Sequence, residues 1–193
     1  MRSDFCVSQD PLISLLTSNR VITLQTLQLF INGQVVNVQS AADSTALQAI
    51  RNQRGLTASR FGCGQEQCGA CHVLIDGQSK PSCQLPVEAL VGRSVVTLES
   101  AQNLELPSTP YLKALQSAFV DEQAAQCGYC TSGLLISAAA LLMSAHETVS
   151  DLQIREALEP HLCRCGTHNR ALRAVKKAAL QCGLKVTPSE VSA

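Results

Sequence analysis

Residues 61–83 contain Phe61-Gly62-Cys63-Gly64-Gln65-Glu66-Gln67-Cys68-Gly69-Ala70-Cys71-His72 and, at their end, Cys83. Gaps of four and two residues separate the first three cysteines. This C-x4-C-x2-C…C spacing is typical of plant-type [2Fe–2S] sites. The glycines let the loop fold tightly and bring backbone N–H groups close to the sulfurs. We therefore expect an iron–sulfur cluster whose ligands are Cys63, Cys68, Cys71 and Cys83.

Two other uses of these cysteines fit the spacing less well. Structural zinc favours paired C-x2–4-C knuckles, whereas the gaps here are unequal. A disulfide framework is typical of a short secreted chain with a signal peptide. Residues 1–23 carry only a short apolar patch at 12–16 and no twin arginine, so we expect a loosely packed extension there. We also expect a cytoplasmic location, where thiols stay reduced.

The composition excludes several classes of function. The chain has 193 residues, 46% of them hydrophobic, and a formal net charge of zero. The neutral balance argues against a nucleic-acid-binding protein or one that binds a membrane surface. The longest apolar run, at 134–143, is interrupted by Ser137 and is far shorter than the roughly 20 residues that span a bilayer.

The residues around the cysteine loop show strand and turn signals. Apolar residues alternate on both sides of Asn32-Gly33, a strong hairpin signal. Asp43 is expected to cap a short helix that ends at Gly55. With further strands at 72–75 and 94–98, this order predicts an α+β chain whose residues 24–100 form a β-grasp, plant-type ferredoxin domain.

The second half of the chain has a helical pattern. After an expected linker at 101–110, Ser108-Thr109 before Pro110 predicts a helix start. Ser150 and Gln153 form a capping box, and Gly183 is expected to end the last helix. Apolar residues at helical spacing predict a four-helix bundle over 111–183, followed by a tail at 184–193.

This helical half has four more cysteines, in Cys127-Gly128-Tyr129-Cys130 and Cys163-Arg164-Cys165. Each pair lies where a helix is expected to begin or end, so two loops at one end of the bundle can present four thiolates. A C-x2-C pair with a distant C-x-C pair is less specific than the first motif, and a tetrahedral zinc site stays open as an alternative. The iron–sulfur signature earlier in the chain favours a second cluster.

The two motifs together resemble a known family. Gln126-Cys127-Gly128-Tyr129-Cys130 and Leu162-Cys163-Arg164-Cys165-Gly166, combined with the first cysteine loop, are similar to the small iron–sulfur subunit of the molybdenum hydroxylase (xanthine oxidase) family. The resemblance covers residues 25–182. The Gly166-Thr167-His168-Asn169-Arg170 segment resembles the bacterial branch that includes isoquinoline 1-oxidoreductase, nicotinate dehydrogenase and some aldehyde dehydrogenases.

The resemblance implies a partner and an electron path. A separate large subunit would hold molybdopterin, as the cytosine dinucleotide, and oxidise an N-heterocycle or an aldehyde. The cluster of Cys127, Cys130, Cys163 and Cys165 would lie near the pterin, with Gln126 and Cys165 against it. The cluster of the first loop would lie nearer the acceptor, which is a flavin (FAD) subunit or a cytochrome.

A few residues depart from the family pattern or stand outside it. Glu66 stands where the family has glycine, and we expect it to point to solvent. His72 replaces a common threonine and is expected to form a hydrogen bond or to take an edge position rather than to bind metal. His161 and His168 are not needed as ligands, and Cys6 and Cys182 are expected to be free thiols.

The sequence leaves three candidate functions. The first is an electron-transfer subunit of a molybdenum hydroxylase, which makes the chain part of an oxidoreductase. The second is a free-standing two-cluster ferredoxin, which would need a strongly acidic surface that the neutral charge does not provide. The third is a zinc-stabilised interaction module, which would be colourless. The first agrees best with both motifs.

Overall fold

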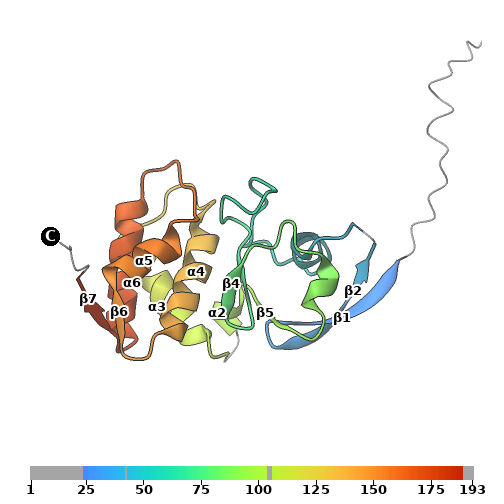
Figure 1. Ribbon diagram of the computed structural model, residues 1–193, viewed down its shortest axis with the longest axis horizontal. Helices are drawn as coiled ribbons and strands as arrows, with labels where there is room; N and C mark the ends of the chain where they lie inside the picture. Colours follow the sequence, from blue (N-terminus) through green and yellow to red (C-terminus); the bar gives the residue numbers. More distant parts are fainter. Residues whose placement is uncertain (1–23, 42, 104–105, 189–193) are drawn as a thin grey trace, which may run out of the picture.

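The computed structural model describes residues 24–41, 43–103 and 106–188, which form a sheet lobe and a helical lobe side by side (Figure 1). The extension at 1–23, which includes Cys6, lies outside the described residues. None of the helices in this described part is long and apolar enough to cross a membrane.

The sheet lobe is built on the expected hairpin. β1 (Gln25–Ile31) and β2 (Gln34–Ser40) pair antiparallel around Asn32-Gly33, and both turn residues have positive φ, 51° and 78°. The sheet order is β2-β1-β5-β3-β4. Here β5 (Ser94–Val96) runs parallel to β1, and β3 (Val73–Ile75) and β4 (Gln78–Lys80) form a second hairpin. The prediction of a β-grasp arrangement is confirmed.

The short helix of this lobe begins two residues later than expected. α1 (Ala46–Gln48) and the π-helical turn η2 (Ala49–Gln53) are capped by Thr45, not by Asp43. The Thr45 hydroxyl accepts from the Gln48 amide at 3.3 Å, and the Gln48 side chain accepts from the Thr45 amide at 3.1 Å. The prediction for Asp43 was wrong because threonine with glutamine three residues later completes a capping box that Asp43 lacks. Together with η3 (Val87–Leu90), α1 and η2 pack on one face of the sheet.

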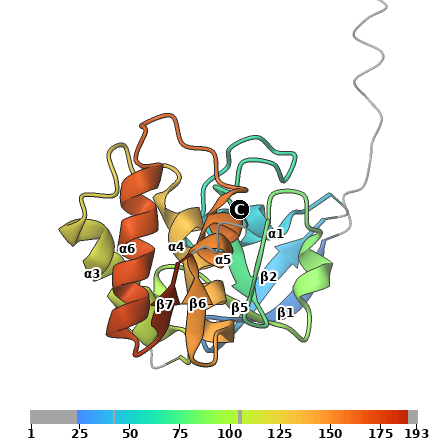
Figure 2. The ribbon, with the colours of Figure 1, turned by 60° about the vertical axis from the view of Figure 1, so that its left-hand side comes forward.

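The helical lobe contains α3 (Thr109–Asp121), α4 (Thr131–Ser144), α5 (Asp151–Leu158) and α6 (His168–Gln181), as Figure 2 shows. Ser108 holds the N-cap position of α3, although its side chain makes no capping hydrogen bond. Three elements of this half were not expected from the sequence. A short helix, α2 (Ser100–Asn103), runs into the expected linker. In the expected tail, β7 (Lys185–Thr187) pairs parallel with β6 (Thr148–Ser150), and neither strand was expected.

Strand β3 holds the two lobes together. Its residues Val73 and Ile75 belong to the core of the sheet lobe, whereas Leu74 between them belongs to the core of the helical lobe. This alternation is the usual consequence of a strand that is covered on both faces. In Figure 1, α4 lies beside β4 at the junction of the lobes. The cysteine loop before β3 is therefore anchored to α4 as well as to its own sheet.

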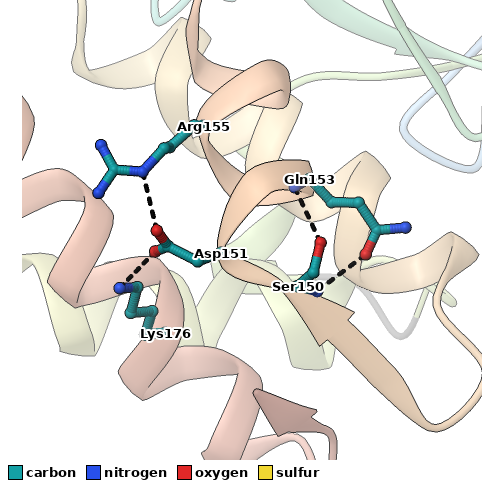
Figure 3. Close-up of polar contacts among 5 residues, drawn as sticks. All are labelled: Ser150, Asp151, Gln153, Arg155 and Lys176. Carbon is teal, nitrogen blue, oxygen red and sulfur yellow. Dashed lines mark hydrogen bonds and ion pairs between the residues drawn. The ribbon is translucent and has the colours of Figure 1, made fainter. Parts of the chain in front are cut away.

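Helix α5 begins with the capping box that the sequence predicts (Figure 3). The Ser150 hydroxyl accepts from the Gln153 amide at 3.1 Å, and the Gln153 side chain accepts from the Ser150 amide at 2.8 Å. The next residue, Asp151, is only 7% exposed. Its carboxylate accepts from Arg155 Nε at 2.8 Å and pairs with the Lys176 ammonium of α6, so it connects two helices. Lys176, and then Arg155, lower the pKa of Asp151.

Replacing Asp151 with asparagine is expected to lower the stability of the helical lobe by about 1–3 kcal/mol at pH 7, because two cations lose their partner. The folded-state pKa is depressed, so the carboxylate stabilises the fold above its unfolded pKa, roughly 3.9, and the effect is lost as the pH falls through the folded value. Urea unfolding at pH 7 and below pH 4 measures this. Asp121→Asn, which breaks the solvent-exposed pair with Lys177, is the control and should lower the stability much less than Asp151→Asn does. Equal effects of the two variants at pH 7 would contradict the assignment.

Candidate metal centre

The first cysteine loop surrounds its thiols with backbone N–H donors. The amides of Gln65 and Gln67 donate to Cys63 Sγ at 3.3 and 3.2 Å, and the Cys63 amide donates to Cys68 Sγ at 3.3 Å. The Ser82 amide donates to Cys71 Sγ at 3.4 Å. N–H groups directed at sulfur stabilise thiolates and the sulfurs of bound clusters.

Position 62 requires glycine because the backbone there lies close to the sulfur of Cys68. A Cβ built on Gly62 would lie 2.5 Å from Cys68 Sγ, closer than two such atoms can come. The loop therefore wraps around its sulfurs so tightly that no side chain fits at this position.

The thiols of this loop differ in burial, and the pKa values of Cys63 and Cys71 are shifted in opposite directions. Cys63 is exposed, and the Gln65 amide, followed by further hydrogen bonds, lowers its pKa to about 7. Cys71 and Cys83 are buried, and burial raises the pKa of Cys71 to about 11. Metal ligation requires the thiolate, so the buried pair becomes a good ligand set only when a bound cation compensates its charge.

The second cysteine group is assembled from two loops at helix ends. Cys130 is the N-cap residue of α4, and Cys163 and Cys165 lie between α5 and α6. Cys165 Sγ lies 3.5 Å from Cys127 Sγ. The four cysteines thus lie together at one end of the helical lobe, where the sequence predicts them.

The pKa values again distinguish buried and accessible thiols. Burial raises the pKa of Cys130 to about 12. Burial also acts to raise the pKa of Cys163, but hydrogen bonds with the Thr167 hydroxyl and the Cys130 thiol outweigh it and lower the pKa to about 7. Cys130 and Cys163 therefore form a second interacting pair beside Cys127 and Cys165.

Within each group the thiols interact with one another. In the first group, Cys63 interacts with Cys68, and Cys71 with Cys83. In the second group, Cys127 interacts with Cys165 and Cys163, and Cys130 interacts with Cys163 and Cys127. A [2Fe–2S] cluster is held by four thiolates distributed over two irons. Two groups of four thiols therefore fit two such clusters.

The two loops lie at the same end of the molecule (Figures 1 and 2). They border one cavity of about 280 Å³. The first loop contributes Cys63 and Cys68, and the second group contributes all four of its cysteines. Tyr129 spans the two loops, since its hydroxyl donates to the Phe61 carbonyl while the Arg60 guanidinium lies 5.7 Å from its ring. The structure thus brings together six of the eight predicted ligands around one space.

The remaining residues singled out in the sequence have clear positions. Gln126 is exposed in a bend directly before Cys127, so its side chain is accessible to a partner. Glu66 is exposed and has φ 62°, which explains why glycine is suited to this position. Its carboxylate therefore points to solvent, as expected. Cys182 is half-buried and free.

Three histidines near the cysteines form hydrogen bonds. His72 Nδ1 lies 2.7 Å from the Ser79 hydroxyl, as the expectation of a hydrogen-bonding role requires. His161 Nε2 lies 2.7 Å from the Ser137 hydroxyl, and His168 Nε2 lies 3.0 Å from the His161 carbonyl. Burial lowers the pKa of His72 to about 4 and that of His161 to about 3. No local pattern predicts the Ser137 contact, because Ser137 lies 24 residues before His161 and in another element.

Comparison with protein-family models assigns both halves of the chain. Residues 29–93 match the 2Fe-2S iron-sulfur cluster binding domain, and residues 97–176 match the [2Fe-2S] binding domain. The two matches place one cluster in each lobe.

Related proteins of known function are similar along most of their length. One of them belongs to the nicotinate dehydrogenase of Pseudomonas putida, and the chain is 46% identical to this relative over 154 residues and covers 94% of it. Another belongs to the isoquinoline 1-oxidoreductase of Brevundimonas diminuta, and here the identity is 39% and the chain covers 97% of the relative. These matches include 80% and 79% of this chain.

Solved structures show the same arrangement. Quinoline 2-oxidoreductase from Pseudomonas putida 86 superposes with a TM-score of 0.72 at 30% identity, over 83% of this chain and 96% of the matched one. The aldehyde oxidoreductase from Desulfovibrio desulfuricans also gives a TM-score of 0.72, at 32% identity over 82% of this chain. The chain covers only 17% of that longer protein.

Proposed function

The chain belongs to the small [2Fe–2S] subunits of the molybdenum hydroxylases, and from this membership we propose that it works beside a large molybdopterin-binding subunit. It is an electron-transfer subunit of an oxidoreductase with two [2Fe–2S] clusters. The substrate of the complex is proposed to be an N-heterocycle or an aldehyde, because related subunits serve nicotinate dehydrogenase, isoquinoline 1-oxidoreductase and an aldehyde oxidoreductase.

One observation carries the assignment of the ligands. The sheet lobe and the helical lobe each contribute four thiols, and the two sets meet at one end of the molecule. We assign one cluster to each set of four. The first set is Cys63, Cys68, Cys71 and Cys83, and the second is Cys127, Cys130, Cys163 and Cys165.

The protein residues hold the clusters and adjust their surroundings. When bound, each [2Fe–2S] cluster takes up and releases one electron at a time. The amides of Gln65 and Gln67 stabilise negative charge on Cys63, and the buried Cys71 and Cys83 thiols keep water from one side of the first site. Burial of Cys130 has the same effect in the second site.

The direction of electron flow is part of the proposal. The exposed Gln126 and the half-buried Cys165 are proposed to face the pterin, so the second set receives electrons from the partner. The first set then delivers them to an acceptor, which is a flavin (FAD) subunit or a cytochrome. We place the complex in the cytoplasm, where free thiols stay reduced until they bind metal.

Metal analysis of the native complex tests this function. The chain should co-purify with a much larger molybdenum-containing chain, and should contain about four irons with equal sulfide, as expected for two [2Fe–2S] sites. Electron paramagnetic resonance (EPR) of the reduced complex should show two distinct signals. Stoichiometric zinc in place of iron would contradict the cluster assignment. Purification of the chain alone and free of molybdenum would favour an independent ferredoxin.

A further inference from the structure

Three segments, each next to a proposed ligand, meet at one buried point. Gly69 lies between Cys68 and Cys71, Gly133 is in the first turn of α4 after Cys130, and His161 precedes Cys163 by two residues. A Cβ built on Gly69 would lie 2.1 Å from His161 Nδ1, and one built on Gly133 would lie 2.2 Å from the Gly69 carbonyl oxygen. The first cysteine loop therefore rests directly on α4 and on the His161 ring.

A chain of polar contacts fixes the His161 ring in this place. Its Nε2 lies 2.7 Å from the Ser137 hydroxyl of α4, and Ser137 lies 2.7 Å from the Ser79 hydroxyl of β4. Ser79 in turn contacts His72, next to Cys71, at 2.7 Å. The His72 and His161 rings pack edge to face with centroids 4.9 Å apart. His161, Ser137 and His72 are 1%, 5% and 8% exposed, so the ring has little space in which to move.

The backbone on both sides of the ring is held as well. The Leu162 amide donates to the Cys68 carbonyl at 3.1 Å, which joins the two cysteine loops directly. The His161 carbonyl accepts from His168 Nε2 at 3.0 Å. His161 thus contacts helix α4, the loop of the first cysteine set and the start of α6, although it lies on the loop of the second set.

We propose that His161 is a positioning residue that sets the place of the first cluster loop relative to the second, and so the rate at which electrons pass between the two clusters. This rests on the proposed function, in which both clusters lie on one electron path. Electron tunnelling between two centres slows exponentially with their separation, so a small shift of one loop changes the rate strongly. No ligand role is needed, because four thiols are present in each set.

The test compares His161→Ala, His161→Gln and Ser137→Ala in the assembled complex. Iron content reports whether both clusters form. The readouts of position are the splitting of the two EPR signals in the fully reduced complex, which arises from spin coupling between the clusters, and the two reduction potentials. His146→Ala is the control, since His146 is exposed beyond the C-terminal end of α4, whereas the cysteines are at its N-terminal end.

His161→Ala should keep both clusters, lose or alter the splitting, and slow electron transfer between the clusters by about tenfold or more. His161→Gln should recover part of the splitting, because its terminal amide can take the place of the ring Nε2 and still meet the Ser137 hydroxyl. His146→Ala should match the wild type. Unchanged splitting and potentials in an iron-replete His161→Ala complex would overturn the proposal.

If His161→Ala does not fold, Ser137→Ala still tests the proposal. This variant removes one hydroxyl from the interior of a helix and leaves a residue of higher helix propensity. If Ser137→Ala changes the EPR splitting in the direction expected for His161→Ala, the positioning role is supported. If Ser137→Ala shows the wild-type splitting, the positioning role is rejected. A wild-type complex without two [2Fe–2S] signals would instead reject the proposed function itself.

Discussion

A chain with Cys165 replaced by alanine is expected to hold about two irons instead of four, and to show only one of the two EPR signals. Cys165 Sγ lies 3.5 Å from Cys127 Sγ, so its loss removes one of the four thiols of the second set. The first set belongs to the other lobe, which has its own core around β1, β3 and β5. The EPR signal of the cluster in the first set should therefore be retained. In the complex, reduction of the acceptor by substrate should stop, because the second set is proposed to receive the electrons.

Two further variants make this result specific. Cys182→Ala removes a half-buried thiol outside both sets and should retain about four irons. Cys71→Ala should remove the other EPR signal and leave the signal of the second set. Iron and sulfide analysis with EPR measures all three. Retention of both signals and of substrate-driven acceptor reduction by Cys165→Ala would show that the ligand assignment and the electron path are wrong.

Replacing Gly69 with alanine is expected to destabilise the chain by about 2–5 kcal/mol and to reduce the occupancy of the first cluster. Gly69 has φ 74°, where an L side chain is strained by roughly 1–2 kcal/mol. In addition, the new Cβ would lie 2.1 Å from the His161 ring, and overpacking of a buried contact costs about 1–3 kcal/mol. Because His161 is held by Ser137, the loop with Cys68 and Cys71 has to move instead.

Gly183→Ala is the matched control for this prediction. Gly183 has a similar φ of 81°, but a Cβ there would meet no atom within 4 Å. This variant therefore carries the backbone strain without the collision, and should cost only about 1–2 kcal/mol with full iron content. Thermal or urea unfolding and iron analysis of the two variants separate the two contributions. An equal loss of stability in the two variants would show that the contact with His161 does not contribute to the destabilisation.

Much of the fold could be predicted because its signals are local. The Asn32-Gly33 hairpin and the Ser150–Gln153 capping box are each specified by residues within three positions of one another, and both were predicted correctly. The error at Asp43 was also local, since Thr45 offers a more complete cap than a lone aspartate. By contrast, β7 pairs with a strand that lies far earlier in the chain, before α5 and α6, and no local pattern indicates such a partner.

The sequence by itself determined the cysteine motifs, because cysteines a few residues apart share one loop and their spacing limits the shape of that loop. The tertiary structure alone decided how the two motifs meet. Packing of Leu74 of β3 into the helical core places the first loop on α4. Gly69, Gly133 and His161 can then touch although they are far apart along the chain. Such contacts depend on long-range packing, which leaves no regular spacing in the sequence. The loop at 61–83 was therefore recognisable as an iron–sulfur motif from its residues, but its support by His161 and Ser137 was not.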